Sequence, residues 1–164
     1  MMNDKTQSKT VVERTYRAHP KELWDLWTTK DGFESWWGPE GFRAHVHTIE
    51  ARAGGQLHYD MIAATPEMIE AMKQMGRPPS HESRGRFAEF RPYERLTLVH
   101  VIDFLPGVQP YDSTIVVDFF PSGEFVRMVV TLHPMHDEEF SNMQVQGFTS
   151  QLTKLDKRFG SGRQ

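Results

Sequence analysis

Three histidines and one aspartate that could bind a metal alternate along two predicted strands: His45, His47, His58 and Asp60. A hairpin that turns at Gly54-Gly55 and pairs His47 with Asp60 would bring all four to one face of a sheet. Imidazole and carboxylate groups in such an arrangement suit zinc or non-haem iron. The alternate positions carry apolar side chains typical of a core face, Val46, Leu57, Tyr59 and Met61. Because a register shift of one residue would separate the four, we expect a polar, solvent-facing surface and predict no metal site and no cofactor.

A single histidine on an apolar strand face is the second candidate for chemistry. His100 shares its side of a predicted strand with Leu98 and Ile102, so its ring would point toward the protein interior. Facing a ligand, it could donate a hydrogen bond or act as a general base near neutral pH, whereas in a core it would be a satisfied structural residue. Gln144 and Gln151, on the inner face of a predicted C-terminal helix, could supply further polar contacts. The chain contains no nucleophile elbow, phosphate-binding loop or zinc-protease motif, so no motif requires an enzyme.

The composition argues against several other kinds of protein. With a formal net charge of -3 and a pI near 6.2, the chain lacks the basic character that nucleic-acid binding usually requires. The absence of cysteine rules out disulfides and thiolate chemistry. Segment 1–9 is polar, without the apolar run of a signal peptide, and we expect a disordered leader there. No stretch approaches the roughly 18 apolar residues of a membrane span, so we predict a cytoplasmic protein that binds neither nucleic acid nor membranes.

Two short predicted helices that carry all four tryptophans follow the first predicted strand, 10–17. Pro20 suits the first turn of the first helix, which extends to about residue 28, and Asp31 can cap the second. Gly38-Pro39 ends this segment. The tryptophans are Trp24, Trp27, Trp36 and Trp37. So much aromatic surface must either fill a core or line a cavity, because each large ring buries roughly 150–250 Å².

The rest of the chain alternates between strands and turns until one long helix. Strands are predicted at 43–51, 56–63, 82–91, 95–105, 113–121 and 124–133, with an inserted helix and loop at 65–79. Asp137 begins an amphipathic helix that runs to about residue 158. Antiparallel strands followed by one long helix predict an α+β fold, a single domain at 10–160 in which a curved sheet wraps around the helix.

Five motifs occur in an order typical of one superfamily. Val12–Thr28 follows the pattern hydrophobic-x-Arg-x-Tyr-x-Ala-x-Pro-x-x-Leu-Trp-x-x-Trp-Thr. The others are Trp-Trp-Gly-Pro-x-Gly-Phe at 36–42, Gly-Gly at 54–55, Pro-x-Glu-Arg-Leu at 92–96 and Gly-aromatic-x-x-x-Leu-x-x-Leu at 147–155. Together they resemble the START-like, polyketide-cyclase-type (SRPBCC) superfamily, in the branch named after the C-terminal domain of the activator of heat-shock protein 90 ATPase. The resemblance implies a helix-grip fold across 10–160. We expect no counterpart in this chain of the N-terminal chaperone-binding domain of those cochaperones.

The resemblance implies that the protein binds a small hydrophobic or aromatic molecule in a cavity between the sheet and the C-terminal helix. Two other functions stay open. One is a cofactor-independent enzyme of cyclase or hydrolase type that uses polar cavity groups. The other is a protein-interaction module of chaperone-regulator type, with a protein partner or a second copy of the chain. A cavity with buried polar groups favours the first two functions, and a collapsed interior with an exposed apolar patch favours the third.

The residues expected at the cavity come from most of the predicted elements. Trp36 and Trp37 would form its wall or rim, unless they simply fill the core. A methionine stripe, Met68, Met72 and Met75, would make the inserted helix a lid, a dimer contact or ordinary packing. The full set predicted to line or border the cavity is Trp27, Trp36, Trp37, Phe42, Tyr59, Met61, Met68, Met72, His100, Phe104, Tyr111, Gln144, Gly147 and Phe148.

Overall fold

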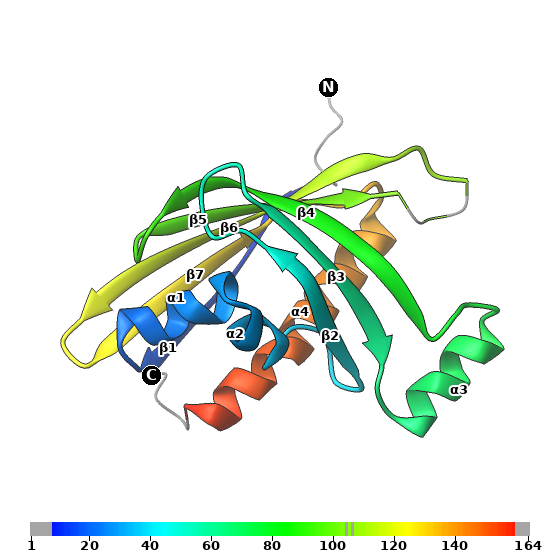
Figure 1. Cartoon of the computed structure of the whole chain (residues 1–164), viewed down its shortest axis with the longest axis horizontal. Helices are drawn as coiled ribbons and strands as arrows, with labels where there is room; N and C mark the ends of the chain where they lie inside the picture. The colour runs from blue at the N-terminus through cyan, green and yellow to red at the C-terminus, as the bar shows by residue number, and fades with distance from the viewer. Residues whose placement is uncertain (1–7, 104, 106, 160–164) are drawn as a thin grey trace.

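The fold is built on one antiparallel sheet that curls around a long helix (Figure 1). The computed structural model describes residues 8–103, 105 and 107–159. The strands are β1 (Thr10–Arg17), β2 (Phe42–Ile49), β3 (Gln56–Ala63), β4 (Ser80–Arg91), β5 (Arg95–Ile102), β6 (Tyr111–Ser122) and β7 (Phe125–Leu132). The helices are α1 (Pro20–Thr28), α2 (Lys30–Glu34), α3 (Pro66–Gln74) and α4 (Glu138–Arg158). The predicted α+β helix-grip architecture is confirmed; Phe104 and most of the predicted leader lie outside the described residues.

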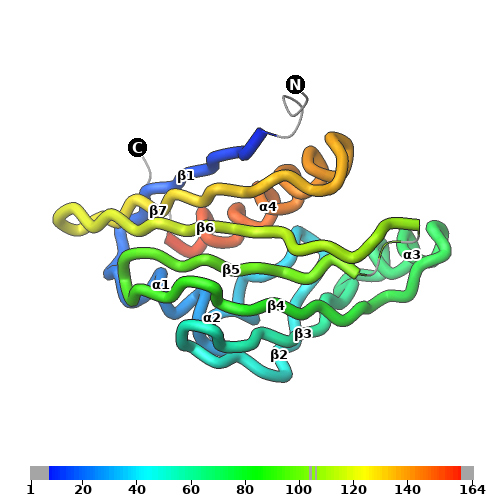
Figure 2. The backbone as a smooth tube through the Cα atoms, turned by 90° about the horizontal axis from the view of Figure 1, so that it is seen from above, coloured from blue at the N-terminus to red at the C-terminus, as the bar shows by residue number. Residues whose placement is uncertain are grey.

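The sheet has the strand order β1-β7-β6-β5-β4-β3-β2, which Figure 2 shows from above. Its inner face follows from the alternation of apolar side chains along each strand. On β7, Val126, Met128 and Val130 are fully buried, whereas Arg127 between them is exposed. This alternation turns a continuous apolar surface toward α4.

Caps that the sequence supplies locally fix the two short helices after β1. α1 begins with a reciprocal capping box between His19 and Glu22. α2 is capped by Thr29 rather than by Asp31 as predicted, because Thr29 Oγ1 accepts the backbone N–H of Gly32 at 3.0 Å. α2 is therefore one turn long, and the two tryptophans that were expected within it follow it in an irregular turn.

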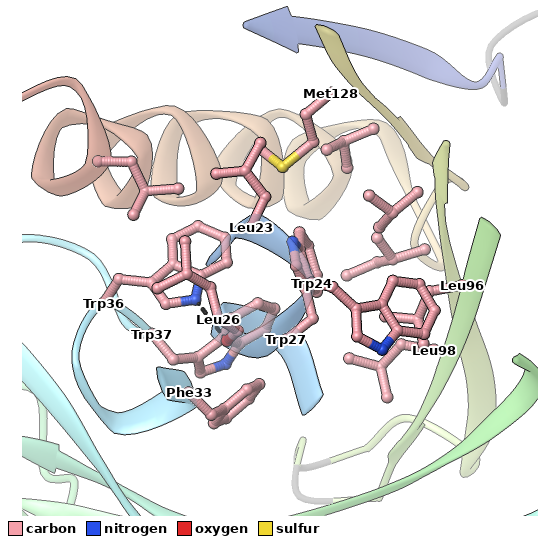
Figure 3. Close-up of a cluster of buried hydrophobic side chains, with 14 of the residues drawn as sticks. Leu23, Trp24, Leu26, Trp27, Phe33, Trp36, Trp37, Leu96, Leu98 and Met128 are labelled. Atoms are coloured by element: carbon pink, nitrogen blue, oxygen red, sulfur yellow. Dashed lines mark hydrogen bonds between the residues drawn. The ribbon is translucent and has the colours of Figure 1, made fainter. Parts of the chain in front are cut away.

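The tryptophans gather where α1 and α2 meet the inner face of the sheet (Figure 3). All four are at most 5% exposed. Trp27 meets Trp36 and Trp37 edge to face, with ring centroids 5.0 and 5.5 Å apart. Trp36 Nε1 donates to the carbonyl of Leu26 at 2.9 Å, which ties the turn after α2 back to α1. This aromatic cluster closes one end of the space between the sheet and α4.

α4 lies against the inner face of the sheet and is anchored at both ends. Asp137 caps its first turn, and Leu152 and Leu155 in its second half are buried. Asp156 accepts a hydrogen bond from the hydroxyl of Tyr16 on β1 at 2.6 Å. Within the described residues, none of the helices combines the length and the apolar character that crossing a membrane would require.

α3 lies at the other end of the sheet from α1 (Figures 1 and 2). Thr65 caps it and Pro66 begins it, as predicted from the sequence. Of its apolar residues, Met72 is buried, whereas Ile69 is 45% exposed. Met75, which follows the helix, is 62% exposed.

Candidate functional site

A cavity of about 390 Å³ lies between the sheet and α4. Volumes of roughly 300–1,000 Å³ are typical of small-molecule sites. Apolar side chains make most of the wall, among them Ile102, Ile115 and Leu132 from the sheet and Phe148 from α4. Trp37 lines the same cavity, so one tryptophan of the aromatic cluster is also part of the wall.

A chain of hydrogen bonds crosses this apolar wall. Trp37 Nε1 donates to the hydroxyl of Tyr59 at 2.9 Å, and that hydroxyl lies 2.9 Å from Nε2 of His100. The indole of Trp37 also stacks on the imidazole of His100, with ring centroids 6.0 Å apart and planes within 14°. The three groups hold one another in place and present their rings to the cavity.

Small residues on the intervening strand allow this contact. Tyr59 belongs to β3 and His100 to β5, with β4 between them. The residue of β4 paired with Tyr59 is Ser83, and the residue paired with His100 is Gly85. A Cβ at Gly85 would lie 2.7 Å from the carbonyl oxygen of Val99, so no larger residue fits there without a shift of the strands.

The polar groups of the wall are uncharged near neutral pH. Burial raises the pKa of Tyr59 to about 12, although hydrogen bonds from Trp37 and Ser83 act in the opposite direction. Burial lowers the pKa of His100 to about 4. Burial, together with the charge of Arg77, also lowers the pKa of His81, which lines the cavity on β4. The site therefore offers hydrogen bonds without fixed charge.

Gln151 of α4 is a deeply buried polar residue of the wall, at 4% exposure. Its Oε1 accepts the backbone N–H of Gly38 at 2.7 Å. Its Nε2 has no hydrogen-bond partner among the described residues. On the same turn, Lys154 Nζ donates to the carbonyls of Gly38 at 2.7 Å and Phe42 at 3.2 Å. Two side chains of α4 thus clamp the turn that carries Trp37.

Half of the residues predicted at the cavity lie on its wall in the structure. They are Trp37, Tyr59, Met61, His100, Gln144, Gly147 and Phe148. Trp27 and Trp36 lie in the aromatic cluster instead, because their rings pack mainly on each other and on the neighbouring rings. Phe104 falls outside the described residues.

The other predicted residues make local contacts away from the cavity wall. A Cβ at Gly41 would lie 3.0 Å from Cε of Met68, which shows that this methionine packs over the turn before β2. Met72 is buried but, like Met68 and Phe42, is not among the described residues that line the cavity. The hydroxyl of Tyr111 lies 2.9 Å from Nδ1 of His136 and accepts the His136 N–H, so it borders the β7–α4 connection.

Sequence reasoning missed several wall residues. They are His81 and Ser83 on β4, Ser113 on β6, Met135 in the connection after β7, and Phe140 and Met143 on α4, together with parts of β5 and β6. A signal for β4 was present, because the inward positions His81 and Ser83 alternate with the exposed charged residues Glu82 and Arg84.

The histidines of β2 and β3 lie on the opposite, outer face of the sheet, as expected. A bulge between Val46 and Thr48 changes the predicted register, so His45 rather than His47 pairs with Asp60 in the ladder. His47 Nε2 nevertheless lies 2.9 Å from Oδ2 of Asp60. Across the described residues, no group of three or more histidine, aspartate or glutamate side chains is arranged to hold a metal ion.

The depressed pKa of His100 predicts a specific pH dependence of stability. Between the unfolded pKa of 6.5 and the folded value of about 4, only the unfolded chain binds a proton at this residue, so acidification destabilises the fold. His100→Gln keeps a hydrogen-bonding side chain but removes this titration. We expect the wild type to lose on the order of 2 kcal/mol more than the variant between neutral pH and about pH 4. Urea unfolding across that range measures the difference, and parallel pH profiles would contradict it.

Comparisons with known proteins agree with this architecture. The profile of the family described as "Activator of Hsp90 ATPase homolog 1-like protein" matches residues 17–160. A solved protein from Chromobacterium violaceum is 18% identical with a TM-score of 0.74, and the AHSA1 protein from Silicibacter pomeroyi is 19% identical with a TM-score of 0.72. Each alignment covers 92% of this chain and 96% of the other. At these identities the likeness shows the fold alone. No curated protein matches the chain.

Proposed function

The chain belongs to the family of Activator of Hsp90 ATPase homolog 1-like proteins, and we propose that it binds a small, mainly apolar molecule in the cavity between the sheet and α4. The fold of this family typically binds hydrophobic ligands. The observation that carries the proposal is a cavity of about 390 Å³ whose wall is apolar apart from a few buried polar groups. An apolar molecule in this space would remove the apolar wall from water, which favours binding.

The polar groups of the wall suit binding better than proton transfer. A general acid or base works best when its pKa lies near the working pH. Tyr59, with a pKa near 12, and His100, with a pKa near 4, are both far from neutrality. Their mutual hydrogen bond instead fixes two rings against which a flat molecule can stack. This favours ligand binding over the enzymatic alternative.

The protein-interaction alternative rests on the exposed apolar residues at α3. Ile69 and Met75 are 45% and 62% exposed at the end of the sheet remote from α1. Two such side chains make a small patch, and scattered apolar residues are normal on protein surfaces. The cavity between the sheet and α4 is the larger apolar feature, so we give the ligand-binding function precedence.

Thermal unfolding in the presence of a panel of small aromatic and aliphatic compounds tests the proposal. A compound present at about a hundred times its Kd should stabilise the fold by about 2.7 kcal/mol, seen as a higher Tm. Native mass spectrometry of the purified protein should show the same compounds bound in a ratio of one to one. A panel that leaves Tm unchanged throughout would rule the proposal out.

A further inference from the structure

One buried side-chain amide at the cavity wall has an unused hydrogen-bond donor. Gln151 is 4% exposed and lines the cavity from α4. The backbone N–H of Gly38 can only donate, so the atom that accepts it at 2.7 Å must be the amide oxygen. This contact fixes the orientation of the amide, and Nε2, on its other branch, has no partner among the described residues.

An unused buried donor is unusual, because leaving one unpaired costs roughly 1–3 kcal/mol. Nearly all buried polar groups in folded proteins have a partner. The amide cannot rotate to find one without giving up the bond to Gly38, and that bond holds the turn after Trp37 against α4. An acceptor placed in the cavity beside Gln151 would satisfy this donor while the bond to Gly38 stays in place.

The rest of the wall restricts what that acceptor can be. The lining residues that the structure describes include no aspartate, glutamate, lysine or arginine. Lys154, on the same turn of α4, directs its ammonium group to the carbonyls of Gly38 and Phe42. An anionic ligand group would therefore lose its water without gaining a counter-charge, which disfavours a carboxylate.

We infer that the ligand is an uncharged, largely apolar molecule with a carbonyl-type oxygen, and that this oxygen accepts a hydrogen bond from Gln151 Nε2. The inference rests on the proposed function, since it names the chemical class of the molecule bound in the same cavity. Trp37, Tyr59 and Phe148 contact the apolar body of that molecule, while Gln151 orients its oxygen. Gln151 is thus a specificity-determining residue.

Three naphthalene probes of similar shape test the inferred features of the ligand one by one. Methyl naphthyl ketone carries the carbonyl oxygen, ethylnaphthalene lacks it, and naphthoate carries a negative charge. For each protein we compare the Kd of the ketone with the Kd of the hydrocarbon, so that general changes in folding or cavity size cancel from the ratio. Gln151→Met keeps the length of the side chain and should shift this ratio about tenfold toward the hydrocarbon. Gln146→Met makes the same chemical change on the exposed side of α4 and should leave the ratio as in the wild type. Naphthoate should bind the wild type about a hundredfold more weakly than the ketone.

A second measurement does not depend on a variant that might lose the contact with Gly38. In NMR spectra of the wild type, the side-chain amide protons of Gln151 should shift downfield on addition of the ketone and not on addition of the hydrocarbon. If both probes bind with an unchanged ratio in Gln151→Met and the amide protons do not respond, the inference is wrong and the proposed function stands. Tighter binding of naphthoate than of the ketone would also overturn the inference. If no probe binds, the proposed function fails and the inference fails with it.

Discussion

A phenylalanine in place of Gly147 is expected to block ligand binding while the protein stays folded. Gly147 lies in the middle of α4 and lines the cavity. A Cβ at this position would meet no atom within 4 Å beyond the backbone of its own helix and its chain neighbours, so the new side chain has open space to enter. The phenylalanine ring would take up the room that the ligand needs within about 390 Å³. We expect Kd for methyl naphthyl ketone to rise at least about a hundredfold, a loss of about 3 kcal/mol in binding free energy.

The same substitution is expected to raise the stability of the unliganded protein. Glycine in a helix interior costs roughly 0.5–1 kcal/mol relative to alanine, and the added ring buries apolar surface. The free energy of unfolding should therefore increase by roughly 1 kcal/mol, measured in urea. Loss of binding together with a gain in stability cannot result from damage to the fold.

Two further variants of α4 serve as controls for Gly147→Phe. Thr149→Phe adds a ring on the exposed side of the helix and should bind the ketone as the wild type does. Gly147→Ala adds one methyl group, so it should gain helix stability and keep most of the affinity. If Gly147→Phe binds both naphthalene probes like the wild type, the ligand site lies elsewhere.

Much of the fold was predictable because local patterns agree with the tertiary structure. Alternating apolar residues identified the strands, and Pro20, Thr65 and Asp137 marked the starts of three helices. The errors arose where two signals compete within a few residues. Thr29 and Asp31 are both good caps, but Thr29 has the extended backbone that a cap needs, whereas Asp31 lies within the first turn of α2.

The cavity was less predictable, because its volume depends on small residues that leave space open rather than on a characteristic motif. Ser83 on β4, Ser113 on β6 and Gly147 on α4 all line it, and all are small. They come from segments far apart in the sequence, and only the strand order brings them to one space. The contact between Tyr59 and His100 has the same origin, since it depends on Gly85 in the strand between them.

Alanine in place of Trp36 is expected to cause a large loss of stability while sparing the residues of the cavity wall. Trp36 is 1% exposed and packs against Trp27 and Phe148, with ring centroids 5.0 and 6.1 Å away. Its removal leaves a void in a closely packed region and deprives the carbonyl of Leu26 of its donor. Substitutions of this kind cost about 3–5 kcal/mol, which urea unfolding would detect. Phe120→Ala removes a ring that is 46% exposed and should cost less than about 1 kcal/mol.

The neighbouring tryptophan should respond differently, because it belongs to the wall. Trp37 lines the cavity, stacks on His100 and donates to Tyr59, whereas Trp36 does none of these. Trp37→Ala should therefore weaken ketone binding much more than Trp36→Ala does, when both are measured under conditions where each variant is folded. Equal losses of affinity would mean that the aromatic cluster acts as one unit. A larger loss of affinity in Trp37→Ala would show that these adjacent residues have different roles. Trp36 then packs the end of the domain, and Trp37 contacts the ligand.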